Sequence, residues 1–255
     1  KCKKIMKFHP KEKRFYCPKK SCNRRVSIYE KTFFESSKIK INKLLLHCYM
    51  YLVCDCSVNG IKMSLGCSFK TISRWLEYLR QLVGESVPEE KMTIGGPGIT
   101  VEIDETKLGK RKYHRGHRVE GVWIVAGGER TQEKKMFAIN VENRNEETLQ
   151  NVIERYVLPG SIICIDGWKA YKNACLNNNF EHQVVNHSKF FKDPDIGVHT
   201  NTIEGNNNAL KYVIKPRNKN KKSIKYHLLY FLWRRINKKD LSCGFLKALK
   251  EIRYK

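Results

Sequence analysis

The sequence is poor in acidic residues and has no long apolar stretch. Among its 255 residues, 25 Asp and Glu stand against 50 Lys and Arg, which gives a formal net charge of +25 and a pI of about 9.7. The electrostatic field of a protein with this charge attracts polyanions, so we expect nucleic acid as the first candidate partner. The alternative is a ribosome-like or merely soluble basic protein. No run of about 20 apolar residues occurs, so we expect no helix that crosses a membrane.

The start of the sequence also lacks the basic and then apolar pattern of a secretory signal peptide. We therefore expect a protein that is not secreted, which would be nuclear in a eukaryote and located in the cytoplasm or nucleoid in a bacterium. Ten cysteines in such a protein indicate a reducing compartment, where they bind metal or are simply buried. With 41% hydrophobic residues, the chain is long enough to form a core in one or two domains.

Residues 1–35 combine cysteines, basic residues and aromatic residues in the manner of a partial zinc ribbon. Cys17 and Cys22 form a Cys-x4-Cys pair, and Cys2 is the one cysteine before them. Zinc prefers four tetrahedral nitrogen or sulfur ligands, usually supplied by two such pairs. Cys2, Cys17 and Cys22 are therefore candidate zinc ligands. The alternatives are that these cysteines bind no metal and that His9, considered as a fourth ligand, is simply solvated.

Residues 36–83 are expected to form a helical DNA-binding region. Apolar residues recur at helical spacing in two segments, and Ser68 is a candidate N-cap for the second. On that second helix, Lys70, Thr71 and Arg74 lie opposite the apolar face. This arrangement favours a helix-turn-helix whose second helix enters a major groove. An ordinary amphipathic helix is the alternative.

The Gly- and Pro-rich residues 84–98 are expected to be a linker to a main domain over residues 99–255. Apolar runs in that domain predict strands over 99–104, 119–130, 134–143, 161–166 and 182–188, and helices over 146–158, 202–215 and 223–238. Three strands, a helix and a fourth strand are typical of an α/β, ribonuclease-H-like mixed sheet with flanking helices, in which the first and fourth strands are neighbours. We expect this catalytic domain to include a basic C-terminal helix and to follow the small zinc-ribbon and helix-turn-helix region.

Two of the apolar strands end in an aspartate, Asp104 in TVEID and Asp166 in IICID. If these strands are neighbours, their carboxyl ends bring the two aspartates to the edge where open α/β sheets bind ligands. Glu204, near the start of a later helix, is the best third acid. Such oxygen ligands suit two Mg²⁺ or Mn²⁺ ions, which activate a water or a 3′-hydroxyl and stabilise the leaving oxygen. Taken singly, Asp104 or Asp166 is better explained as a turn or capping residue, and it is their combination that favours catalysis.

Basic residues follow Asp104 closely in the sequence. Lys107, Arg111 and Lys112 are expected to meet the phosphate backbone of DNA. Glu105 is interpreted as a neighbour of the site and not as a metal ligand, and Glu102 is given no role.

Three long segments resemble the ISXO-like DDE transposases, whose eukaryotic counterparts form the Merlin superfamily. These segments are EIDETKLGKRKYHRGHRVEGVWIVAGGER, CIDGWKAY and GVHTNTIEGNNNALK. The resemblance implies a DDE transposase that carries out metal-dependent phosphodiester cleavage and DNA strand transfer at the terminal inverted repeats of a mobile element. It assigns the catalytic acids of the family to Asp104, Asp166 and Glu204. It also implies that Lys211 grips phosphate near the transposon end; the alternative is a solvated helix lysine.

The same resemblance implies double-stranded DNA, both transposon ends and target, as the partner. Two ends must be joined, so a homodimer or a larger assembly on DNA is expected. The chain departs from the family at Asn206–Asn208, where an aromatic residue is common, and in its incomplete zinc ribbon.

Two other functions stay open at this stage: a domesticated, non-catalytic DNA-binding protein, and another nuclease with the ribonuclease H fold. The three intact acids argue against the first, and a separate end-binding region argues against the second.

Overall fold

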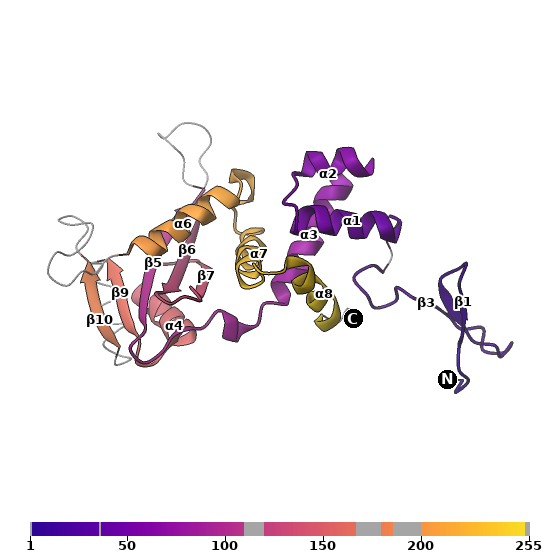
Figure 1. Ribbon diagram of the computed structural model, residues 1–255, viewed down its shortest axis with the longest axis horizontal. Coiled ribbons are helices and arrows are strands. Elements are labelled where there is room, and N and C mark those ends of the chain that lie inside the picture. The colour runs from indigo at the N-terminus through magenta and orange to yellow at the C-terminus, as the bar shows by residue number, and fades with distance from the viewer. Residues whose placement is uncertain (1, 36, 110–119, 167–179, 186–199, 253–255) are drawn as a thin grey trace. The chain divides into compact units, whose positions relative to one another are not determined.

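The computed structural model describes residues 2–35, 37–109, 120–166, 180–185 and 200–252, with the backbone alone for residues 166 and 181–185 (Figure 1). The chain divides into two compact units. One combines Lys1–Leu82 with Asp240–Lys255, and the other is Val83–Lys239. No helix in the described ranges is both long and apolar enough to cross a membrane.

The first unit contains a small antiparallel sheet and a group of helices. Its elements are β1 (Lys7–His9), β2 (Arg14–Tyr16), β3 (Arg25–Ser27), α1 (Ile41–Leu52), α2 (Val58–Leu65), most of α3 (Phe69–Glu85) and α8 (Leu241–Glu251). The strands lie in the order β1-β2-β3. Helix α8 packs against α1, so residues from the end of the sequence complete a unit that is otherwise N-terminal.

The turn between α2 and α3 has clear local causes. Gly66 ends α2 in the left-handed conformation, with φ 64°, that glycine adopts at little cost. Ser68 then caps α3, because its hydroxyl accepts a hydrogen bond from the backbone N–H of Thr71 at 3.2 Å. Ile72 and Leu79 of α3 are fully buried, so the helix is amphipathic as the spacing predicts. The predicted N-cap is thus confirmed.

The second unit is built on a mixed five-stranded sheet. Its elements are η1 (Glu89–Lys91), β4 (Ile94–Gly95), β5 (Thr100–Leu108), β6 (Val122–Glu129), β7 (Met136–Val141), α4 (Glu146–Tyr156), β8 (Val157–Leu158), β9 (Ile162–Asp166), β10 (Glu181–Val185), α6 (Asn201–Val213), η2 (Pro216–Asn218) and α7 (Ile224–Ile236). The sheet order is β10-β9-β5-β6-β7. β5, β6 and β7 are antiparallel, whereas β9 runs parallel to both β5 and β10. The predicted α/β class and the pairing of the first strand with the fourth are confirmed.

Helices cover both faces of this sheet (Figure 1). On one face α4 packs against β5, β6, β7 and β9, and its Tyr156 stacks on Phe137 with ring centroids 5.1 Å apart. On the other face α6 and α7 pack against β5, β6 and β7 through residues such as Ile124, Ile203 and Leu228. The result is a three-layer arrangement in which Glu102 and Asp104 of β5 face α6.

Two local features differ from the expectation. Strand β5 does not end at Asp104, because its antiparallel pairing with β6 continues to Leu108, which lies opposite Val122. The segment expected as a linker contributes β4, which pairs with β8, and its Ile94 is fully buried. Asp104 is therefore a mid-strand residue, held on a longer strand than the apolar run indicates.

Candidate active site and cysteine cluster

The parallel pairing of β5 with β9 brings the two predicted aspartates to the same level of the sheet. The last paired residues are Glu102 and Cys164. Asp104 and Asp166 each lie two residues further along their strands, in the same direction. The side chain of Asp166 lies outside the described part of the chain, so its position is fixed here by the backbone of β9 only.

Helix α6 lies over the face of β5 that carries Asp104. The side-chain amide Nδ2 of Asn207 donates a hydrogen bond of 2.8 Å to Oδ2 of Asp104. Glu204 lies three residues before Asn207 and thus on the same side of the helix. Its exposed carboxylate accepts a hydrogen bond of 3.2 Å from the Thr200 hydroxyl. The helix face that contacts Asp104 is therefore the one that carries the third predicted acid.

Glu102, for which the sequence predicts no role, holds the first turn of α6 against β5. Its side chain is fully buried and accepts a hydrogen bond of 2.9 Å from the backbone N–H of Ile203. Its other oxygen accepts one of 2.6 Å from Arg130 Nε. Because side chains alternate along a strand, Glu102 shares the face of Asp104. That two-residue spacing is the feature of the sequence that could have identified it.

Asn206, the residue before Asn207, also holds helix α6 in place. Its Oδ1 accepts a hydrogen bond of 2.6 Å from Arg235 of α7, and burial lowers the pKa of that guanidinium. Its amide also packs closely over Gly128 of β6, where an added Cβ would lie 3.2 Å from Nδ2. A glycine at this strand position lets α6 approach the sheet closely.

The residues predicted to bind phosphate lie on β5, on α6 and in a segment outside the described residues. Lys107 is on the face of β5 opposite Asp104, with Nζ 5.3 Å from the centre of the Trp123 ring. Arg144 stacks on the same ring at 3.7 Å and forms an ion pair with Glu105, also at 3.7 Å. Arg111 and Lys112 lie outside the described residues.

Lys211 is exposed in the last turn of α6, seven residues and about two turns from Glu204 on the same side of the helix. On α3, Lys70 and Arg74 are exposed and Thr71 is half-buried. These side chains occupy the polar side of a helix whose opposite side is buried, as the sequence predicts.

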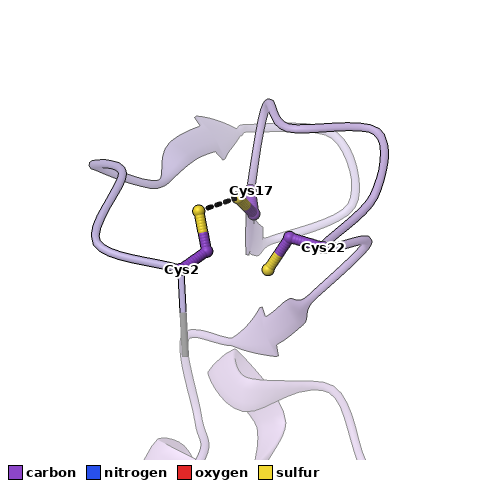
Figure 2. A group of neighbouring side chains, drawn as sticks. All are labelled: Cys2, Cys17 and Cys22. Carbon is purple, nitrogen blue, oxygen red and sulfur yellow. Dashed lines mark hydrogen bonds between the residues drawn. The ribbon is translucent and has the colours of Figure 1, made fainter.

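Cys2, Cys17 and Cys22 converge although up to 20 residues separate them (Figure 2). Their sulfur atoms all lie within 4.8 Å of one another, and Sγ of Cys17 is 3.8 Å from Sγ of Cys2. Zinc–sulfur bonds of about 2.3 Å in a tetrahedron place two sulfurs about 3.8 Å apart. A hydrogen bond from the backbone of Arg24 and the neighbouring Cys17 thiol lower the pKa of Cys22, which favours the thiolate that binds metal. The three cysteines thus fit three of the four ligands of a zinc ion.

His9 does not join these sulfurs. Its Nδ1 accepts a hydrogen bond of 3.2 Å from the backbone N–H of Glu12, and the described cluster consists of the three cysteines alone.

One comparison with known proteins assigns the chain to a family. Among solved structures, a chain of the crystal structure of a pre-cleavage Mos1 transpososome is similar over 85% of this chain and 80% of that chain, with 8% sequence identity and a TM-score of 0.23. A TM-score this low does not establish a shared fold. The comparison with curated proteins gave no match. The family model of the ISXO2-like transposase domain matches residues 94–234, which span the whole described sheet and helices α4 and α6. This match covers more than half of the chain, and the chain therefore belongs to the ISXO2-like transposase family.

Proposed function

We propose that the protein is an active DDE transposase that cleaves DNA at the terminal inverted repeats of a mobile element and joins the freed ends to target DNA. The observation that carries the proposal is the hydrogen bond by which Asn207 ties Asp104 to the helix face bearing Glu204. Asp166 stands at the same level on the adjacent parallel strand. The strand order β10-β9-β5-β6-β7, with one antiparallel and one parallel half, supports a ribonuclease-H-like core.

The donor atoms of this site suit Mg²⁺ or Mn²⁺. Asp104 is half-buried, Glu204 is exposed, and both offer carboxylate oxygens, which these ions prefer to nitrogen or sulfur. Asp104, Asp166 and Glu204 would hold the ions. Two bound ions would supply activation of a water or 3′-hydroxyl and stabilisation of the leaving oxygen. The chain's own residues hold the carboxylates of Asp104 and Glu204 in place and orient the DNA beside them.

The remaining residues in this proposal bind DNA. Lys211, Arg111 and Lys112 contact phosphates near the cleavage site, and Lys107 contacts DNA from the opposite face of β5. The exposed side of α3 enters a major groove with Lys70, Thr71 and Arg74. The convergence of the three cysteine sulfurs supports a structural Zn²⁺ that holds the small sheet of the first unit. Because two transposon ends must be cut and joined together, the working form is a homodimer or larger assembly on DNA.

The test is metal-dependent nicking of a labelled duplex that carries the element's own end and its flanking DNA. With Mg²⁺ the wild-type chain should nick at the end, and Asp104→Asn, Asp166→Asn and Glu204→Gln should each lower the rate by about 10³-fold or more, because each removes a ligand of the ions that supply the chemistry. The matched control is Glu147→Gln, an equally conservative change at an exposed position of α4 on the other face of the sheet. It should nick at the wild-type rate.

Three outcomes would contradict the proposal. End binding without cleavage by the wild-type chain in Mg²⁺ and in Mn²⁺ would indicate a non-catalytic DNA-binding protein. Faster cleavage of RNA–DNA hybrids or junctions than of the element's ends would indicate a different nuclease. Full activity in the three acid variants would mean that the chemistry lies elsewhere.

A further inference from the structure

We propose that Asn207 is a further residue of this active site, which positions the Asp104 carboxylate for metal binding. The inference rests on the proposed function and adds a residue to it. In the sequence Asn207 is the middle residue of three consecutive asparagines, Asn206–Asn208, and nothing in the pattern separates it from its two neighbours.

The structure separates the three asparagines by burial and by partner. Asn208 is exposed. Asn206 is buried and accepts its hydrogen bond from Arg235, away from the acids. Asn207, with 2% of its surface exposed, is the residue whose amide reaches Asp104, at 2.8 Å across 103 residues of sequence. Asn207 thus acts directly on a predicted metal ligand.

The direction of this hydrogen bond is set by chemistry. A carboxylate only accepts hydrogen bonds, so the amide NH₂ of Asn207, and not its oxygen, must face Asp104. The bond holds one carboxylate oxygen and thereby fixes the plane and direction of the whole group. Partners that orient metal ligands in this way are needed for tight metal binding.

Asn207 is itself held in place from two sides. The backbone N–H of Ile203, one turn earlier in α6, is bound to the buried carboxylate of Glu102 at 2.9 Å. Asn206 is bound to Arg235 at 2.6 Å. The first bond ties the start of α6 to β5 and the second ties the helix to α7, so the Asn207 amide is presented to Asp104 in a fixed position.

The second atom of the Asn207 amide points to a ligand. Its Oδ1 is buried and accepts no hydrogen bond within the described part of the chain. Buried carbonyl oxygens of this kind are rarely left without a donor. The oxygen belongs to the same amide that contacts Asp104, and it suits a water of the ion's hydration shell, because Mg²⁺ keeps several of its waters when bound to protein.

The experiment measures metal binding by the full chain without DNA and without turnover. Free Mn²⁺ is followed by electron paramagnetic resonance as it is titrated into wild type, Asp104→Asn, Asn207→Ala, the double variant, and Asn208→Ala. We expect Asn207→Ala to weaken Mn²⁺ binding about tenfold. Asn208→Ala, the same change one residue away at an exposed position, should bind as wild type does.

The double variant separates positioning from a general loss of structure. If Asn207 acts through Asp104, adding Asn207→Ala to Asp104→Asn should weaken binding no further. Binding of end DNA without added Mg²⁺ or Mn²⁺ should be unchanged in Asn207→Ala. Should that variant fail to fold, Asn207→Leu, which has nearly the same shape, fills the space without donating a hydrogen bond and is expected to show the same tenfold loss.

The outcomes distinguish the inference from the function on which it rests. If Asp104→Asn weakens Mn²⁺ binding while Asn207→Ala and Asn207→Leu bind as wild type does, the inference is overturned and the proposed function stands. If the losses in the double variant multiply, Asn207 does not act through Asp104. If Asp104→Asn leaves Mn²⁺ binding unchanged, the proposed metal site is wrong and the inference falls with it.

Discussion

Glu102 and His47 are both fully buried polar side chains, but they differ in the hydrogen bonds that the surrounding protein offers them. Glu102 receives hydrogen bonds from Ile203 N–H and Arg130, so its burial is compensated. His47 of α1 is equally buried, but neither ring nitrogen has a hydrogen-bond partner among the described residues. A carboxylate with two donors organises its neighbours, whereas an unpartnered imidazole remains a cost to stability that depends on its charge.

That cost predicts a pH dependence for the stability of the first unit. Burial lowers the pKa of His47 from its ordinary 6.5 to about 4. As pH falls below 6.5, the unfolded chain binds a proton that the folded chain refuses, so stability is lost progressively down to pH 4. At pH 5 the loss should reach about 2 kcal/mol, from about 1.4 kcal/mol for each pH unit below 6.5.

The measurement is urea unfolding at pH 7 and pH 5, compared between wild type and His47→Leu. The leucine variant should lack this contribution, so its advantage over wild type should grow by about 2 kcal/mol on going to pH 5. An equal loss of stability in both proteins would show that His47 does not titrate in this way.

The residues of the site divide according to what a linear pattern can reveal. Asp104 and Glu204 can be predicted as site residues from the sequence, because each acid stands next to an apolar strand or helix pattern, where a carboxylate is unusual without a functional or capping role. The spacing from Asp104 places Glu102 on the same face of the strand but does not reveal its partner, Ile203 N–H, and Asn207 has no such signal, since its partner Asp104 is about a hundred residues distant in sequence. The roles of such residues become visible only when α6 is placed on β5.

Among the secondary-structure elements, strand β6 can pack closely against both neighbouring layers because it contains two adjacent glycines. Gly128 leaves room for Asn206 on the α6 side, while Gly127 faces Phe137 on the α4 side. A Cβ added at Gly127 would overlap the Phe137 ring, which is fully buried. The strand thus accepts a helix on one face and a large aromatic ring on the other without separating the layers.

Gly127→Ala should therefore destabilise the second unit by about 1–3 kcal/mol, the usual cost of overpacking a core. Gly60→Ala provides the comparison, because the new Cβ in α2 would meet only Ser57 Oγ at an ordinary 3.5 Å. Alanine is the better helix former, so this variant should be neutral or more stable by up to about 1 kcal/mol. Thermal unfolding followed by circular dichroism measures both. Equal stability of Gly127→Ala and wild type would mean that the Phe137 ring moves aside easily.

Most elements of the second unit follow from their apolar patterns, including all five strands of the main sheet and helix α4. Apolar patterns do not predict the extent of an element correctly where strand pairing, and not burial, determines it. β5 extends through Glu105 and Lys107 because β6 continues beside it, and β4 and β8 are two-residue strands that exist only as a pair. The sequence gives no bounds for helix α8, since its apolar residues pack against α1, which lies far before it in the sequence.

At the scale of the whole molecule, the net charge of +25 governs how tightly the chain binds DNA. Each phosphate neutralised by a lysine or arginine releases counterions, so affinity falls steeply as salt rises. The wild-type chain should show a steep linear fall of log affinity with log salt concentration, whatever the DNA sequence.

Lys211→Ala should reduce that slope by about 1, the value expected for the loss of one phosphate contact. Lys135→Ala removes the same charge from a residue already paired with Glu133 at 3.4 Å, and it should leave the slope unchanged. Fluorescence anisotropy with end DNA over a range of potassium chloride concentrations measures both variants. If the two slopes fall equally, Lys211 contributes only to the general charge and does not contact a particular phosphate.

The return of α8 to the first unit has a consequence for synthesis of the protein. Because Asp240–Lys255 belongs with Lys1–Leu82, that unit is interrupted by the whole of Val83–Lys239. On the ribosome, α1 is therefore synthesised well before its partner helix α8, and the sheet that carries the acids emerges between them. A nonsense mutation just after Lys239 would spare every residue of the second unit and yet release a polypeptide whose first unit lacks α8. Such a product would be exposed to proteases before it reached DNA.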